Sequence, residues 1–204
     1  MIVLATTSRT LRRTAKMERI TKETSVTVEV NIEGSGKTTV KTNIPFIDHL
    51  ITAIGKHSMM DIILTGKSND GITHHLIEDV SIVLSQTIDK ALYDRSQITR
   101  FGYAIVPMDE SLAYVSIDLV KRQFCNIQLK LTRDVIEGIP REDLEHFVSS
   151  IAQHLNACTH IIIEYGDNDH HKIESAMKAF AISLRMAASI DKKRKEVPST
   201  KGAM

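Results

Sequence analysis

The chain has 204 residues, 42% of them hydrophobic and 25% charged, an ordinary composition for a soluble globular protein with a sizeable core. The net charge of +1 and the absence of tryptophan argue against a nucleic-acid-binding surface. No apolar run approaches the ~20 residues of a membrane helix, and the opening MIVLA is too short for a signal-peptide core. Cys125 and Cys158 lack metal or redox spacing and fit a reducing compartment, so we expect a cytoplasmic protein without membrane or nucleic-acid partners.

Residue periodicity predicts strands, a helix, a strand and a second helix in the first half of the chain. Residues 25–32 alternate apolar and polar side chains, as expected of a strand with one buried face. Pro45 suits the first turn of a helix, and apolar residues then recur at helical spacing. In chain order, the expected elements are strands at 25–32 and 37–42, a helix from Pro45, a strand at 61–64 and a helix over 74–93.

The second half repeats this order. Its expected elements are strands at 103–107, 112–119 and 123–131, a helix near 143–156, a strand at 159–165 and a helix over about 171–190. We therefore predict an α+β fold that is internally duplicated, with each half a β-sheet that carries two helices on one face. The predicted division is residues 1–95, residues 96–190 and a C-terminal tail, 191–204, with the two halves forming one compact unit.

A histidine motif recurs with the same period as these elements. His74-His75-Leu76-Ile77-Glu78 and His170-His171-Lys172-Ile173-Glu174 both have the pattern His-His-x-x-Glu, 96 residues apart. An acid–histidine pair precedes each motif: Asp48-His49 in the first half and Glu145-His146 in the second. Chance is a poor explanation for a pattern that repeats together with its upstream partner.

The repeated pattern predicts two metal ions. A helix turns about 100° per residue, so adjacent histidines diverge, whereas a glutamate three or four residues on shares their face. Dividing the repeated side chains evenly gives three histidines and one glutamate for each of two metals. Imidazole and carboxylate without thiolate suit manganese, iron or zinc, and an open octahedral shell favours manganese. Single histidines are usually surface or core residues, the interpretation that applies to His57, His154 and His160 taken alone.

Together with further segments, these motifs resemble the imidazoleglycerol-phosphate dehydratases. The resemblance covers about residues 9 to 202 in the expected order. The segments that carry it are Arg19–Thr24, Phe46–Leu50, His74–Asp79, Arg100–Gly102, Val106–Glu110, Glu145–Phe147, Asp167–Glu174, Lys178–Phe180 and Pro198–Gly202.

The resemblance implies a particular division of the ligands. One metal would bind His49, His75, Glu78 and His170, and the other would bind His74, His146, His171 and Glu174. It further implies two Mn²⁺ per subunit and a homo-oligomer of twenty-four subunits with its sites at subunit interfaces. We therefore expect one chain alone to lack complete sites.

The resemblance also implies a hydro-lyase of histidine biosynthesis that converts imidazole-glycerol phosphate to imidazole-acetol phosphate. The expected catalytic set is the eight metal ligands and Glu23, which is the candidate proton shuttle and a substrate contact. An ordinary carboxylate at a strand edge is the alternative for Glu23. The other expected substrate contacts, most of them on the phosphate side, are His57, Arg100, Arg122, Lys178, Ser199, Thr200 and Lys201; the tail from Ser199 to Lys201 would close over the substrate.

Two other functions fit the histidines. A dimetal hydrolase with a bridging hydroxide explains the ligands equally well but leaves the phosphate-side basic residues unexplained. In a non-catalytic metal-storage shell, Glu23 and Arg100 would be dispensable.

Overall fold

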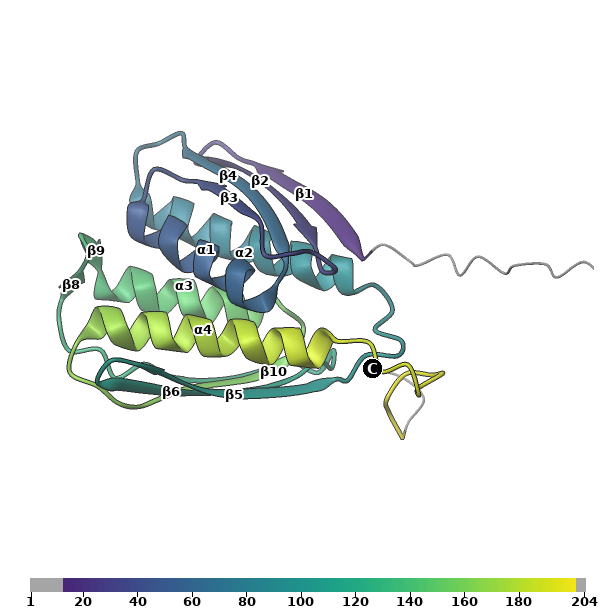
Figure 1. Ribbon diagram of the computed structural model, residues 1–204. Helices are drawn as coiled ribbons and strands as arrows, with labels where there is room; N and C mark the ends of the chain where they lie inside the picture. The colour runs from purple at the N-terminus through teal and green to yellow at the C-terminus, as the bar shows by residue number, and fades with distance from the viewer. Residues whose placement is uncertain (1–12, 201–204) are drawn as a thin grey trace, which may run out of the picture.

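The chain forms four layers in the computed structural model, which describes residues 13–200. Two four-stranded sheets are the outer layers, and two pairs of helices fill the space between them (Figure 1). Helix α1 packs against α4, and α2 packs against α3, so the two halves of the chain meet through their helices. The C-terminal tail leaves the far end of α4 (Figure 1).

The first half contains one sheet and two helices. Its strands lie side by side in the order β1-β2-β4-β3, and β3 runs parallel to β4 while the other pairs are antiparallel. The elements are β1 (Thr14–Ile20), β2 (Thr24–Asn31), β3 (Thr38–Lys41), α1 (Pro45–Ser58), β4 (Asp61–Ser68) and α2 (Thr73–Leu92).

The second half has the same topology. Its sheet order is β5-β6-β10-β7, again with one parallel pair, β7 and β10. The elements are β5 (Phe101–Met108), β6 (Ser111–Asp118), β7 (Phe124–Gln128), the hairpin β8 (Val135–Ile136) and β9 (Ile139–Pro140), α3 (Arg141–Gln153), β10 (Cys158–Tyr165) and α4 (Asp169–Ala188). The α+β class and the internal duplication are confirmed, whereas the exact division at residues 95 and 190 stays a prediction.

The sequence analysis missed three strands. β1 is an edge strand whose outward side chains are exposed and charged, so it carries only a weak apolar alternation. The hairpin β8–β9 has two residues in each strand, too few for any periodicity. The expected strand at 123–131 is also shorter in the structure, since it ends at Gln128.

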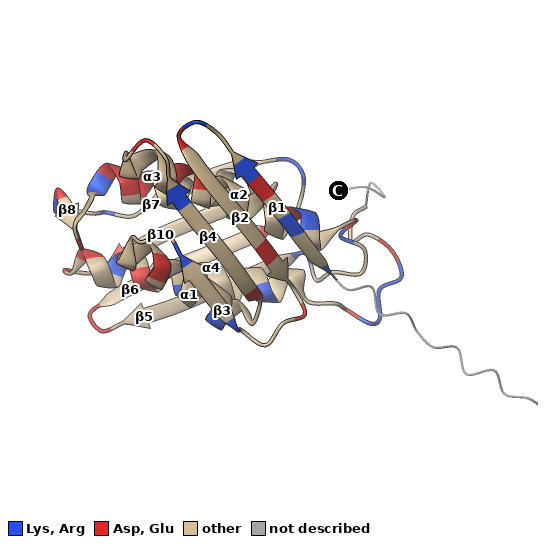
Figure 2. Cartoon of the chain, turned by 90° about the horizontal axis from the view of Figure 1, so that it is seen from above, with Lys and Arg blue, Asp and Glu red and all other residues tan. Residues whose placement is uncertain are grey.

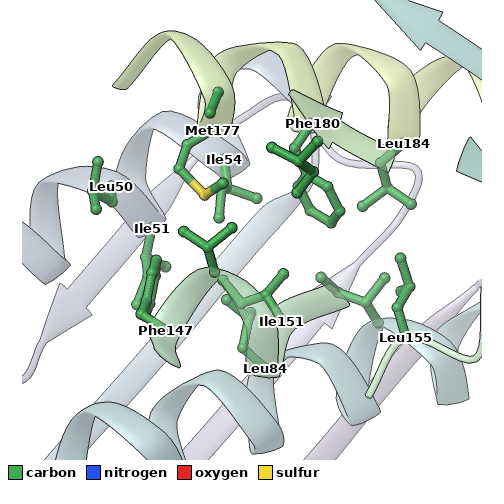
Figure 3. Packing of buried hydrophobic residues seen from close by; sticks show 14 of the residues in the cluster. Leu50, Ile51, Ile54, Leu84, Phe147, Ile151, Leu155, Met177, Phe180 and Leu184 are labelled. Atoms are coloured by element: carbon green, nitrogen blue, oxygen red, sulfur yellow. The ribbon is translucent and has the colours of Figure 1, made fainter. Parts of the chain in front are cut away.

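The core extends between the helix pairs. Figure 3 shows Ile51 of α1, Phe147 of α3 and Phe180 of α4 pointing into the same interior space. These three side chains are at most 1% exposed. They belong to a wider cluster that also includes Leu50, Ile54, Leu84, Ile151, Leu155, Met177 and Leu184. Helices of both halves contribute to this cluster, so neither half has a core of its own there.

Close backbone approach fixes α4 on the second sheet. A Cβ atom at Gly102 of β5 would lie 1.9 Å from the carbonyl oxygen of Ser183 on α4. Only glycine fits at this contact. The position of α4 matters because its two ends border the two regions described below.

The outer faces of the two sheets differ. The first sheet carries charged side chains on β1 and β2 (Figure 2). Among them, Nζ of Lys16 on β1 lies 3.9 Å from Oε2 of Glu29 on β2. The second sheet exposes three large apolar side chains in a row on β5: Phe101, Tyr103 and Ile105 are each more than half exposed. Among the described residues, no helix is long and apolar enough to cross a membrane.

Candidate metal centre

The helices of each half begin at the same end of their sheet. Each helix follows one strand of a parallel pair, β3 and β4 in the first half and β7 and β10 in the second, so its direction is fixed by that pair. The starts of α2 and α4 lie on the side of the molecule away from the tail (Figure 1). We call this side, with the predicted ligands His49, His74, His146 and His170, the histidine end.

The first ligand group lies where α1 packs against α4. The Oε2 atom of Glu174 lies 3.3 Å from Nε2 of His49 and 3.2 Å from Nε2 of His170. These ligand atoms lie within 4.8 Å of one another, close enough to hold a metal ion. Phe46 covers the His170 ring, with ring centroids 4.7 Å apart.

Hydrogen bonds at the two helix starts orient this group. The backbone N–H of Thr42 donates to Oδ1 of Asp48 at 3.0 Å, which ties the first turn of α1 to the preceding loop. Asn168 is the N-cap of α4 and accepts a hydrogen bond from the backbone N–H of His170 at 2.9 Å. Asn168 thereby satisfies a helix donor that has no partner within the helix, whereas Asp48 accepts from a donor in the loop before α1. The positions of His49 and His170 thus follow from local sequence.

The second ligand group lies between α2 and α3. The rings of His74 and His146 stack with centroids 5.2 Å apart, and Nε2 of His146 lies 3.9 Å from Oε1 of Glu78. The Nδ1 atom of His146 is buried and has no hydrogen-bond partner among the described residues. A buried nitrogen without a partner is costly, and a bound ion is one way to satisfy it.

The paired histidines diverge as the helix geometry predicts. The ring planes of His74 and His75 meet at 68°, and those of His170 and His171 meet at 88°. Each motif therefore sends its two imidazoles in different directions, as two separate metals require.

Hydrogen bonds keep the carboxylates of the centre ionised. Burial raises the pKa of Glu174, but hydrogen bonds from Lys178 and His49 outweigh it and lower this pKa to about 2. The backbone N–H of Ile72 and the His75 ring lower the pKa of Asp70 to about 2. The bond to Asp70 in turn raises the pKa of His75.

Glu23 lies in the turn between β1 and β2, at the histidine end. A carboxylate oxygen of Glu23, a carboxylate oxygen of Asp70 and a ring nitrogen of His75 lie within 4.8 Å of one another. The side chain is exposed. The candidate proton shuttle is therefore exposed beside the α2 motif.

Two predicted substrate contacts accompany the first ligand group. Nζ of Lys178 lies 2.8 Å from Oε1 of Glu174. Burial lowers the pKa of His57, and the positive charge of Lys178 lowers this pKa further. A cation and an imidazole thus border the group of His49, His170 and Glu174.

The remaining phosphate-side residues gather elsewhere, at what we call the tail end: Arg100, Asp118 and the segment 198–200. The guanidinium of Arg100 donates to both carboxylate oxygens of Asp118, at 2.7 and 2.9 Å, and to the carbonyl oxygen of Pro198 at 2.8 Å. Arg122 is exposed on the loop after β6, and Ser199 and Thr200 follow Pro198 directly. Lys201 lies outside the described residues.

The tail end and the histidine end are at opposite ends of α4. The backbone N–H of Arg100 donates to the carbonyl oxygen of Ala187 in the last turn of α4, at 2.9 Å, whereas His170 is in the first turn. At 1.5 Å of rise per residue, these points are roughly 25 Å apart along the helix. One chain does not bring Arg100 and His170 to the same small molecule.

The chain also divides each predicted ligand set between two places. His49 and His170 of the first set lie together, but His75 and Glu78 of that set are on α2, in the other group. Within residues 13–200, neither predicted set of four gathers its ligand atoms within 4.8 Å. His154 and His160 lie away from both groups, since Nδ1 of His154 contacts the Ser150 carbonyl oxygen and Nε2 of His160 contacts the Cys158 sulfur.

Four carboxylates that contact Nδ1 atoms of the paired histidines were not predicted from the sequence. Asp70 is five residues before His75, a local spacing that could have drawn attention. Asp143 is 69 residues from His74, so no local pattern could reveal that contact. The other two are Glu110 and Glu137.

Comparison with known proteins gives a consistent result. The family model described as imidazoleglycerol-phosphate dehydratase matches residues 42–184. The imidazoleglycerol-phosphate dehydratase of Chlorobium phaeobacteroides (strain BS1) is 44% identical over 191 residues, covering 93% of this chain and 94% of the relative. The enzyme of that name from Rhodococcus jostii is 41% identical over 201 residues, covering 94% and 98%.

The chain belongs to the imidazoleglycerol-phosphate dehydratase family. The predicted family and enzyme class are thereby confirmed: the chain is a hydro-lyase of histidine biosynthesis. The family is metal-dependent and oligomeric, and its substrate is a small molecule.

Solved structures of the family share the fold. The imidazoleglycerol-phosphate dehydratase of Staphylococcus aureus superposes with a TM-score of 0.79 at 25% identity, over 87% of this chain and 99% of the other. The structure of IGPD from Pyrococcus furiosus in complex with (S)-C348 gives 0.77 at 36% identity, over 92% and 100%.

Proposed function

We propose that this chain removes water from imidazole-glycerol phosphate to give imidazole-acetol phosphate, at a centre of two Mn²⁺ ions per subunit. The observation that carries the proposal is the pair of ligand groups at the histidine end, each built from imidazole and carboxylate. Family membership supports the substrate and the reaction.

The side chains present fit metal ions of this kind. Both groups offer nitrogen and oxygen ligands without thiolate, the donor set that suits manganese. The partnerless Nδ1 of His146 and the close approach of His49, His170 and Glu174 are features that bound cations would explain. We keep the predicted assignment, with His49, His75, Glu78 and His170 on one metal and His74, His146, His171 and Glu174 on the other.

We further propose that each active site is completed by other copies of the chain. The α1–α4 group of one copy would meet the α2–α3 group of another, because each predicted metal takes ligands from both groups. The roughly 25 Å between Arg100 and His170 of one chain supports a tail end supplied by a different copy. The exposed apolar row on β5 is a surface that association would bury. A shell of twenty-four subunits is the predicted assembly.

Other residues of the chain would transfer the proton, bind the phosphate and exclude water. When bound, the two cations would lower the pKa of the substrate's imidazole and so let it accept electron density. Glu23 would carry the proton at its carboxylate, because it is exposed beside His75. Lys178 would hold the phosphate from the histidine end, with Arg100, Arg122, Ser199, Thr200 and Lys201 on the tail side. His57 would border the substrate beside Lys178, and closure of the tail would exclude water.

Metal analysis with a product assay on the purified chain tests this function. We expect about two Mn²⁺ per chain and release of water from the glycerol side chain, seen as imidazole-acetol phosphate. Release of inorganic phosphate without that product would indicate a dimetal hydrolase. Metal uptake without turnover of either kind would indicate a storage shell. The cytoplasmic location stays a prediction.

A further inference from the structure

Each of the four paired histidines has its Nδ1 atom against a carboxylate. The same ring atom is used in every case, although the four carboxylates come from four different places in the fold. The pairs are His74 with Asp143 at 2.6 Å, His75 with Asp70 at 2.7 Å, His170 with Glu137 at 3.1 Å and His171 with Glu110 at 2.7 Å.

This arrangement decides which nitrogen of each ring can bind a metal. A neutral imidazole that donates its Nδ1–H to a carboxylate must present a lone pair at Nε2. The carboxylate also fixes the ring's rotation and makes the ligand more basic. Four rings with the same tautomer would then present Nε2 to metal ions without further rearrangement.

We propose that Asp70, Glu110, Glu137 and Asp143 are positioning residues that hold the paired histidines with Nε2 toward the metals. This inference rests on the proposed metal centre, since it assigns a role to side chains behind its ligands. None of the four would itself bind the ion.

Hydrogen bonds and turn conformations fix the positions of two of these carboxylates. Glu110 uses its second oxygen to accept the backbone N–H groups of Asp167 and Asn168, at 3.2 and 2.8 Å, so its position is fixed from the loop that starts α4. Glu137 sits in the β8–β9 turn in a left-handed conformation, with φ of 49°, followed by Gly138 with φ of 79°. No hairpin lies at the equivalent place of the first half, between β3 and α1, and bringing Glu137 to His170 gives this one a function.

The two halves of the duplication use different carboxylates to contact the second histidine of the motif. Glu23 immediately precedes β2 and Glu110 immediately precedes β6, so they are equivalent positions in the repeat. In the second half Glu110 holds His171, but in the first half Asp70 takes the corresponding contact with His75. Gly166, five residues before His171 as Asp70 is before His75, has no side chain to do so. Because Asp70 makes this contact, Glu23 does not position His75 and is available for proton transfer.

The equivalent pair Glu110 and Glu23 gives a matched test. Mn²⁺ dissociation constants would be measured on assembled protein by the electron paramagnetic resonance signal of free Mn²⁺, a readout independent of turnover. We expect Glu110→Ala to weaken Mn²⁺ binding by roughly 10- to 100-fold, the usual cost of losing such a partner. Glu110→Gln keeps an acceptor oxygen and should recover part of that loss. Glu23→Ala should bind Mn²⁺ like the wild-type chain.

Further variants keep the test decisive. Asp70→Ala, at an exposed position in the other half, should weaken Mn²⁺ binding to the same degree, and exposed Glu142→Gln, next to Asp143, should change nothing. The inference is overturned if Glu110→Ala and Asp70→Ala bind Mn²⁺ as tightly as the wild type, or if Glu23→Ala weakens binding equally. If the wild-type chain itself binds no Mn²⁺, the proposed metal centre fails instead, so the two failures are distinguishable.

Discussion

At the scale of single residues, carboxylates occupy two different kinds of position around the histidines. Glu78 and Glu174 stand among the histidines as predicted ligands, while Asp70 and its three equivalents stand behind the rings. Glu23 belongs to neither class, because it is exposed and Asp70 already takes the Nδ1 of His75. A side chain that is close to the metals and has no positioning duty suits acid–base chemistry.

We expect Glu23→Gln to lower kcat by roughly 100-fold or more while leaving the metal content and particle size unchanged. The substitution keeps the shape of the side chain and removes its titratable proton. Steady-state kinetics on the metal-loaded protein would measure the effect. Lys201→Ala is the comparison, since loss of a phosphate contact should raise KM and leave kcat nearly constant. Normal turnover by Glu23→Gln would make Glu23 a structural carboxylate.

Contacts within one helix could be predicted from the sequence, whereas contacts between distant elements could not. His74, His75 and Glu78 could be predicted as a unit because their spacing within one helix fixes their relative directions. The partnership of Asp143 with His74 could not, because it depends on the packing of α3 against α2. Neither could the bond of Arg100 to Asp118, which makes Arg100 part of the structure as well as a candidate phosphate contact.

At the scale of elements, the junction between the halves depends on one buried arginine. Arg95, 1% exposed, follows α2 and pairs with Asp89 of that helix. It also donates to the carbonyl oxygens of Leu155 and Asn156, at 3.1 and 2.8 Å, in the loop after α3. This side chain therefore ties the second helix of the first half to the first helix of the second half.

Arg95→Met should lower the free energy of unfolding by about 3 kcal/mol, because it leaves a carboxylate and two carbonyl groups without their buried partner. Urea denaturation at fixed protein concentration would measure this. Lys90→Met, at an exposed position on the same helix, is the control and should change stability by less than about 0.5 kcal/mol. Equal stability of the two variants would mean that the junction does not depend on Arg95.

A second element-scale prediction concerns Asp61 at the start of β4. Hydrogen bonds from the backbone N–H groups of Ser35 and Lys37, at 2.8 and 2.9 Å, lower the pKa of Asp61. A depressed pKa contributes stability above the ordinary pKa, and that stability is lost as pH falls through the folded value. Asp61→Asn should therefore cost about 1 kcal/mol at neutral pH, and the difference from wild type should vanish well below about pH 4. A difference that persists unchanged at pH 3 would contradict this assignment.

Elements with strong periodicity were predictable and others were not. All four helices were expected near their observed ranges, because each carries an apolar face that packs on the other helix pair. β1 and the β8–β9 hairpin were missed, although one borders Glu23 and the other carries Glu137. Short or half-exposed strands bury too little apolar surface to leave a pattern in the sequence.

At the scale of the whole molecule, the proposed function requires separated groups to come together. One chain holds two incomplete ligand groups at its histidine end and the Arg100–Pro198 contact at the other. Association of copies would join complementary groups and bury the apolar row on β5. Metal binding energy would then also be assembly energy.

Chelation should therefore dissociate the large assembly as well as abolish turnover. Light scattering before and after verified metal removal would show a fall in particle mass, and added Mn²⁺ should restore it. An assembly that keeps its mass after complete metal removal would show that the subunit contacts do not need the metal.

Complementation between two inactive variants tests the shared site most directly. His170→Ala damages the α1–α4 group, and His146→Ala damages the α2–α3 group. Each variant alone should be inactive. In mixed assemblies from co-expression, about one quarter of the sites would combine an intact group from each variant, so we predict roughly a quarter of wild-type activity. If mixed assemblies stay as inactive as each variant alone, each chain must build its own complete site, and the shared centre proposed here is wrong.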